Sequence, residues 1–288
     1  MKNFIFPSKD YGAWIILNKH EKNILAKVQK FKPLKDWNIN IYRGILTGYN
    51  EAFIIDEETK NKLIKEDKKS KEIIKPLLRG RDIKKYNYDF KKLYLICTFP
   101  SLNLNISDYP AIEKYLKSFG KRLEQSGETG CRKKTNNKWF ETQDATAYYK
   151  DFEKPKIVWA SVGENEYSYI EKGIYLLDTN YFLVCDNENI LKYLIGIFNS
   201  KLFLFALSYK DTPLGDGGAW RHYKYNLEEM TIPEVDKKRA KEIEGLADKV
   251  IDGKKNNIDT KELENQIDKI VYKLYNLNDG EIRLIERK

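Results

Sequence analysis

The sequence predicts an α/β fold, in which a mixed sheet is flanked by helices and followed by a C-terminal helical hairpin. Three observations carry this expectation. Short apolar β-type runs alternate with amphipathic stretches, the long run 190–207 reads as a largely buried helix, and the composition shifts to helix formers from residue 236 onward. With 288 residues and 41% hydrophobic residues, the chain has ample apolar material for a folded core.

The individual elements follow from hydrophobic periodicity. The segment 39–55 is expected to form a hairpin of two strand-type runs around a tight polar turn. Helices are expected over 11–28, 57–71, 111–123 and 190–207, and strands over 92–99, 156–162 and 173–185. The polar segment 126–138 and the glycine-rich segment 211–218 are expected to be loops.

The C-terminal region is expected to form a separate unit. Two apolar stripes at helical spacing, one over 243–251 and one over 263–274, are separated by a break at 253–257. We therefore expect an α/β domain over 1–235 and a helical hairpin over 236–288 that serves as a spacer or docking element.

Charge and cysteine content narrow the function classes. The net charge of +9 and the pI near 9.1 fit a polyanionic partner, and basic residues concentrate in 60–92 and 122–138. Three widely spaced cysteines give neither a zinc-binding spacing nor an even disulfide framework, so reduced thiols and a cytoplasmic location are expected. The most apolar run, 190–207, is interrupted by Lys192 and Lys201 and falls short of a membrane span.

The stretch Arg43–Asp56 is the most informative motif. Gly48 suits a positive φ, and Thr47 and Asn50 can close the turn through side-chain hydrogen bonds. A phosphate-binding loop is excluded, because no Gly-Lys-Ser/Thr follows the glycines.

Further motifs follow this one in a fixed order. They are Pro76 to Tyr86, Lys156 to Trp159, Phe198 to Leu202, Gly218 to Tyr223, and Leu227 to Pro233. Together with Arg43–Asp56, their order and spacing resemble the TaqI-like C-terminal specificity domain, from about residue 40 to about residue 234. The resemblance implies the target-recognition part of a restriction–modification enzyme with an adenine-N6 DNA methyltransferase.

The catalytic motifs of such an enzyme are not found in this sequence. None of the 8 prolines is adjacent to another, so the Pro-Pro loop that holds a flipped adenine cannot form, and Gly215-Asp216-Gly217 is a poor mimic of a cofactor turn. Glu58-Thr59-Lys60 and Glu66-Asp67-Lys68 match a nuclease tripeptide, but such matches are expected by chance in a chain that is 33% charged. His222 is expected to be a surface or hydrogen-bonded histidine.

DNA-contacting residues are expected in three places. The 126–138 loop supplies Arg and Asn for base edges and Lys for phosphates, and the segment around Arg221 and Tyr223 is a second candidate for base reading. Arg79 and Arg81 either clamp phosphate or brace the fold through Asp82 or Glu72, and Lys84 and Lys85 are expected on phosphates. The loop candidates are Arg132, Lys133, Lys134, Thr135, Asn136 and Asn137.

The sequence therefore predicts recognition of double-stranded DNA without a catalytic centre. S-adenosylmethionine and Mg²⁺ are expected only in methyltransferase and nuclease domains, which would lie N-terminal in a parent polypeptide or on a partner chain. Two alternatives remain open. One is a small metal-dependent nuclease, and the other is a basic scaffold that binds protein through the helical hairpin.

Overall fold

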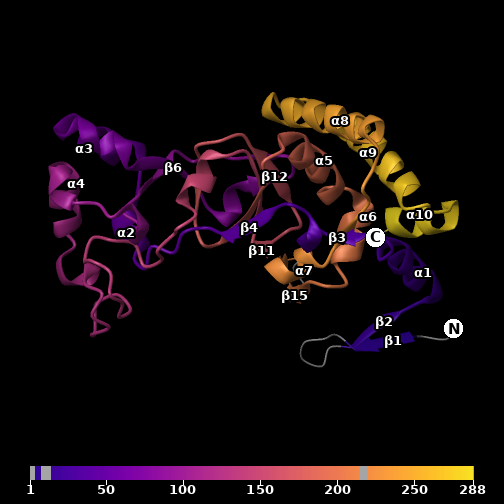
Figure 1. Ribbon diagram of the computed structural model, residues 1–288, viewed down its shortest axis with the longest axis horizontal. Coiled ribbons are helices and arrows are strands. Elements are labelled where there is room, and N and C mark those ends of the chain that lie inside the picture. Colours follow the sequence, from indigo (N-terminus) through magenta and orange to yellow (C-terminus); the bar gives the residue numbers. More distant parts are fainter. Residues whose placement is uncertain (1–3, 8–13, 215–218, 288) are drawn as a thin grey trace.

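The computed structural model describes residues 4–7, 14–214 and 219–287, and shows an elongated mixed α/β molecule (Figure 1). The expected fold class is confirmed. The chain begins with the antiparallel strands β1 (Phe4–Pro7) and β2 (Trp14–Leu17) and the helix α1 (Lys19–Val28). The segment 11–28 was expected to be one helix, so the strand β2 corrects its first half, and residues 11–13 lie outside the described residues.

A four-stranded antiparallel sheet, which we call the central sheet, lies in the middle of the molecule. Its order is β12–β10–β14–β4. Alternation along β10 directs Ile157 and Val158 to opposite faces, where each pairs with a strand β14 residue, Leu183 or Phe182. The central sheet therefore separates two hydrophobic cores. The strand bounds are Asn40–Arg43 (β4), Lys156–Ala160 (β10), Tyr167–Ile170 (β12) and Asn180–Val184 (β14).

The first core belongs to what we call the distal lobe, on the left of Figure 1. Its sheet has the order β13–β6–β9–β5, in which β13 runs parallel to β6 and the other neighbours are antiparallel, so the sheet is mixed. The bounds are Asn50–Phe53 (α2), Ile54–Ile55 (β5), Glu57–Glu66 (α3), Ile74–Leu78 (β6), Leu93–Ile96 (β9), Pro110–Lys117 (α4) and Tyr175–Leu176 (β13).

The expected hairpin at 39–55 is wrong, because β4 and β5 belong to different sheets. The chain crosses from the central sheet to the distal lobe at this point. The turn itself forms as expected: Gly48 has a φ of +79°, Thr47 Oγ1 donates to Asn50 Oδ1 over 2.6 Å, and Thr47 Oγ1 accepts from the backbone N–H of Tyr49. The turn therefore fixes the connection between the two halves of the molecule.

The second core is helical and lies on the opposite face of the central sheet. The run 190–207 forms two helices, α5 (Glu188–Phe198) and α6 (Lys201–Leu207), bent by 74° where Ser200 caps α6 by accepting from the backbone N–H of Phe203. No single helix among the described residues is long and apolar enough to cross a membrane, although this bent pair passes on length and composition. Most of its apolar side chains are buried in the helical core.

The C-terminal helices α8 (Lys237–Lys255), α9 (Lys261–Leu274) and α10 (Asp279–Glu286) complete this core. Helix α8 packs along α5, and the stripes that predicted the hairpin are buried here, including Ile243, Val250, Ile267 and Val271. The hairpin is therefore an integral layer of the fold, and these apolar stripes are not free to dock a partner.

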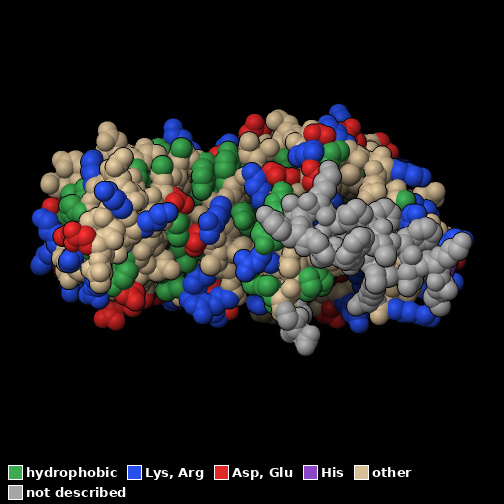
Figure 2. All heavy atoms as spheres, turned by 90° about the horizontal axis from the view of Figure 1, so that it is seen from below, with side chains coloured by type: hydrophobic (Ala, Val, Ile, Leu, Met, Phe, Trp, Pro, Cys, Tyr) green, Lys and Arg blue, Asp and Glu red, His purple; other side chains and the backbone are tan. Residues whose placement is uncertain are grey.

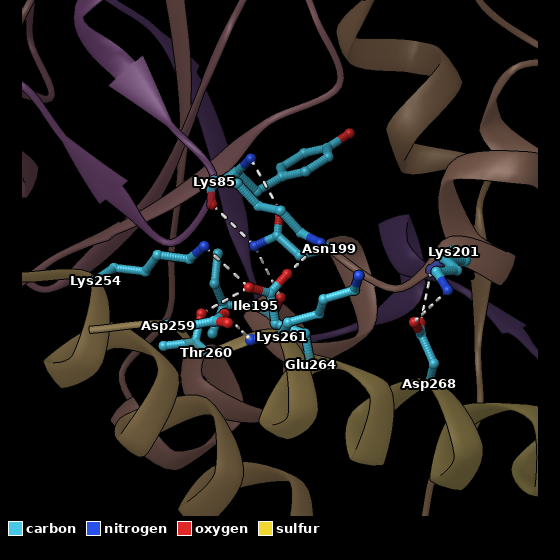
Figure 3. Close-up of polar contacts among 11 residues, drawn as sticks. Lys85, Ile195, Asn199, Lys201, Lys254, Asp259, Thr260, Lys261, Glu264 and Asp268 are labelled. Carbon is cyan, nitrogen blue, oxygen red and sulfur yellow. Dashed lines mark hydrogen bonds and ion pairs between the residues drawn. The ribbon is translucent and has the colours of Figure 1, made fainter. Parts of the chain in front are cut away.

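Polar contacts join this hairpin to the rest of the chain (Figure 3). The half-buried carboxylate of Glu264 accepts from Lys85 at 2.6 Å, from Lys254 at 3.0 Å and from Thr260 Oγ1 at 2.7 Å. Asp268 accepts from the backbone N–H of Lys201 at 2.8 Å, at the start of α6. The contacts with Lys85 and Lys201 therefore join the hairpin to the rest of the chain, whereas those with Lys254 and Thr260 lie within it.

One three-stranded sheet and two pairs of strands complete the architecture. The order β11–β16–β15 gives a three-stranded antiparallel sheet, β7 pairs with β8, and β17 pairs with β3. Their bounds are Lys32–Pro33 (β3), Ile83–Lys84 (β7), Asn87–Tyr88 (β8), Val162–Gly163 (β11), Thr212–Leu214 (β15), Ala219–Arg221 (β16) and Thr231–Ile232 (β17), with the short helix α7 at Lys224–Glu228.

Candidate nucleic-acid interface

The 126–138 loop and the β11–β16–β15 sheet lie on the same side of the molecule, the lower side in Figure 1. Figure 2 views that side and shows Lys and Arg side chains along its length. Two of the three regions that were expected to contact DNA therefore share one face.

The 126–138 loop is irregular, as expected, but it is folded tightly onto itself. The backbone N–H of Arg132 donates to Glu124 O, and Gly127 N donates back to Arg132 O. The side-chain amide of Gln125 donates to the carbonyls of Lys138 and Glu141. The loop is therefore a closed surface element with a defined conformation rather than an open polar tether.

Arg132 occupies the interior of this loop, which corrects its assignment as a base reader. Its side chain is buried, and all five of its N–H groups donate to backbone carbonyls, those of Thr47, Leu123, Trp139 and Glu141. Burial lowers the pKa of Arg132 to about 10. A guanidinium with no remaining donor and no exposure cannot reach a base edge while this arrangement holds.

The other loop candidates divide by their exposure. Thr135 Oγ1 donates to Gln125 Oε1 at 2.7 Å, and the half-buried Asn137 donates to the carbonyls of Thr142 and Gln143, so both support the loop. Lys133, Lys134 and Asn136 are exposed. These three side chains remain candidates for contact with DNA.

The structure also decides between the two roles considered for Arg79. Its guanidinium forms a bidentate pair with Asp82, with Nε to Oδ2 and Nη2 to Oδ1 both at 2.9 Å, which is the bracing role. Lys85 likewise pairs with Glu264 and braces the C-terminal hairpin, so neither side chain is available as the predicted phosphate contact. Arg81 is exposed, and Lys84 is 58% exposed with Glu166 at 3.8 Å.

The β11–β16–β15 sheet presents the most complete set of base-reading groups. Arg221 in β16 is paired in register with Val162 in β11 and with Thr212 in β15. Residues directly opposite one another share a face of a sheet, and all three of these side chains are exposed. An apolar group, a guanidinium and a hydroxyl therefore form one row, which we call the 162–221–212 row.

Sequence reasoning found Arg221 but missed its two neighbours. Val162 and Thr212 are far from Arg221 in the sequence, and only the strand register brings them together. Tyr223, the other candidate here, is half-buried and stacks on Tyr225 with ring centroids 5.1 Å apart. Tyr225 is 48% exposed. Residues 215–218 of the glycine-rich segment 211–218 lie outside the described residues.

The acidic and histidine candidates lie in different parts of the fold. Among the described residues, no cluster of three or more His, Cys, Asp and Glu side chains is arranged to hold a metal ion. Both nuclease-like tripeptides lie on α3 or directly after it, in the distal lobe. His222 is buried and hydrogen-bonded, as one of the two expectations for it stated.

Comparison with known proteins finds a relative in sequence and two solved structures of similar fold. The chain is 25% identical over 248 residues to the type II methyltransferase M.MjaIV of Methanocaldococcus jannaschii, covering 82% of this chain and 78% of that protein. The type IIL restriction-modification enzyme MmeI, solved in complex with DNA, matches 88% of this chain with a TM-score of 0.58 and 13% identity. The type IIG restriction endonuclease BpuSI matches 90% with a TM-score of 0.52 and 12% identity.

The two solved structures are similar in fold, and this chain spans only 35% and 33% of their lengths. The model of the TaqI-like C-terminal specificity domain matches residues 75–230, which is more than half of the chain. This match begins later than the expected start near residue 40 and ends close to the expected end. The chain belongs to the family of TaqI-like C-terminal specificity domains.

Proposed function

We propose that this chain recognises a specific sequence in double-stranded DNA, as the specificity part of a restriction–modification system. Its membership of a specificity-domain family supports this proposal, and the observation that carries it is the 162–221–212 row. Arg pairs with guanine, Thr bonds to several bases, and an aliphatic group contacts the thymine methyl, so the row offers what a major-groove reader needs. The major groove admits a two-stranded β-ribbon, and the β15–β16 pair of this sheet is one.

Affinity in this proposal comes from other exposed cations. Lys133, Lys134, Arg81 and Lys84 would contact phosphate oxygens, which carry no sequence information. Asn136, exposed on the loop, is the second candidate base reader, because Asn pairs with adenine.

Methyl transfer and cleavage belong, in this proposal, to further domains or to a partner chain in the cytoplasm, where S-adenosylmethionine and Mg²⁺ would bind. The sequence supports this division, because it lacks the adjacent prolines of an adenine-N6 methyltransferase. The similarity to M.MjaIV over 78% of its length favours methyl transfer by the chain itself as the second candidate function.

One experiment separates these functions. The full chain is incubated with a pool of random duplexes, bound DNA is sequenced over several rounds, and the enriched duplex is then incubated with chain and labelled S-adenosylmethionine. We expect one short motif to be enriched and no label to be transferred. Absence of any enriched motif contradicts sequence recognition, and transfer of label to adenine establishes the second candidate.

A further inference from the structure

A buried polar cluster lies directly beside the proposed reading strand. His222 follows Arg221 in the sequence, and its ring is buried between two acceptors. Nδ1 lies 2.5 Å from Asp211 Oδ2, and Nε2 lies 3.3 Å from the backbone carbonyl oxygen of Gly163. The Asp211 carboxylate is 1% exposed, and its other oxygen accepts from the side-chain amide of Asn226 at 2.9 Å.

The two partners of the ring determine its protonation state. A carboxylate and a carbonyl both accept hydrogen bonds, whereas a neutral imidazole has only one N–H. Both contacts are satisfied only when both ring nitrogens carry a proton, so the geometry points to an imidazolium paired with a buried carboxylate. Breaking one half of such a pair leaves an uncompensated buried charge.

The cluster connects the ends of the segment that carries the row. Asp211 precedes β15, His222 follows β16, and the ring joins both to Gly163 in β11. The backbone N–H of His222 also donates to Ser161 O at 3.0 Å. The His222 side chain therefore adds a contact between the ends of this segment and β11, beside the strand pairing that places Arg221 and Thr212 opposite Val162.

The charged and titratable surroundings of the cluster are few. Tyr167 lies near Asp211, and burial, with a contribution from that carboxylate, holds the pKa of Tyr167 well above its usual range. Arg221 is exposed, and Lys224 pairs with Glu228 at 3.2 Å. Apart from Asp211, no carboxylate of the described residues forms an ion pair with the His222 ring.

We propose that His222, as an imidazolium bonded to Asp211 and Gly163, is a positioning residue that sets the register of the 162–221–212 row on DNA. The inference rests on the proposed function. It adds that discrimination between DNA sequences weakens at alkaline pH, because loss of one ring proton removes one of the two bonds. The side chains of the row, Arg221, Thr212 and Val162, do not change charge between neutral and alkaline pH.

The first test is independent of DNA. The chain has two histidines, and replacing the exposed His20 by Gln leaves His222 as the single imidazole. Long-range ¹H–¹⁵N NMR at pH 7 is expected to show protons on both ring nitrogens, and loss of one of them in Asp211→Asn. A neutral ring with one N–H at pH 7 would overturn the proposal, whatever the DNA arm shows.

The second test measures how strongly the chain prefers its enriched motif over random duplex at a series of pH values from about 6 to about 9. His222→Asn keeps a donor toward Asp211, His222→Gln keeps one toward Gly163, and His222→Phe keeps neither. In wild type and His20→Gln, the preference should fall about tenfold or more as pH rises.

The variants give the deciding comparison. The two amide variants should show an intermediate preference that does not change with pH, and His222→Phe should lose about ten- to a hundredfold at every pH. A wild-type preference that is flat with pH, or an Asn variant with the wild-type slope, overturns the proposal. If wild type enriches no motif at all, the proposed function fails while the NMR result still decides the state of His222.

Discussion

Arg132 gives the sharpest test of how this structure uses its basic residues. Arg132→Met keeps an unbranched side chain of comparable length but removes all five hydrogen bonds to the carbonyls of Thr47, Leu123, Trp139 and Glu141. Those carbonyls lie on three separate stretches of chain around the 126–138 loop. The substitution should therefore release the loop from the distal lobe.

The expected magnitude follows from the contacts. Each hydrogen bond to a charged group stabilises the fold by about 1.5–3 kcal/mol. Burial of the guanidinium, which lowers the pKa of Arg132 to about 10, offsets about 3 kcal/mol of the stabilisation summed over the five bonds. The lower end of this range gives a fall in the free energy of unfolding of at least about 4 kcal/mol. If the loop opens while the rest of the protein stays folded, the measured loss of stability is smaller, because it cannot exceed the free energy of opening the loop.

The assay combines urea unfolding with limited trypsin digestion, and Lys133→Met is the matched control because it makes the same change on the exposed neighbour. Arg132→Met should lower the urea midpoint and expose residues 124–147 to cleavage, whereas Lys133→Met should do neither. A variant that keeps its stability and protease resistance, yet loses the preference for its DNA motif, would show that Arg132 reads a base after all.

Three further predictions concern pH, salt and phosphate contact. Burial raises the pKa of Asp268 to about 6, so the stability that this group contributes is present below about pH 4 and is lost as pH rises through about 6. In urea unfolding, the stability of Asp268→Asn relative to wild type should therefore rise by on the order of 3 kcal/mol between those two pH values. A stability difference that does not change with pH would contradict this reasoning. Neutralisation of about six phosphates should give a slope of log K against log salt on the order of −5, and a slope near zero would exclude the groove model. Lys84→Ala should weaken motif and random DNA equally in competition binding and reduce the salt slope by about one, and a loss confined to the motif would make Lys84 a base reader.

Periodicity was a sound guide where one face of an element is buried against a continuous core. The apolar run of Ile157, Val158 and Trp159 predicted β10, and the stripes over 243–251 and 263–274 predicted α8 and α9. Such patterns identify an element but not its neighbour. The runs around Gly48 resemble the arms of a hairpin, although their strands pair in different sheets.

The site was harder to predict because long-range partners decide the role of each basic residue. Arg132 and Arg221 both stand in polar segments, yet Arg132 is enclosed by carbonyls from distant positions and Arg221 faces outward from a sheet. Lys85 forms an ion pair with Glu264, which is 179 positions away in the sequence, whereas the neighbouring Lys84 stays exposed. Local composition identifies a basic residue but does not show whether that residue already pairs with an acceptor elsewhere in the fold.

The most direct test of the central claim is the base preference of Arg221→Ala on a panel of single-base variants of the enriched motif. The account predicts a loss of roughly 1–3 kcal/mol for the motif itself and relaxed preference at one base position, with affinity for random duplex nearly unchanged. Full discrimination in Arg221→Ala, at every position of the motif, would contradict the assignment of the 162–221–212 row as the surface that reads DNA.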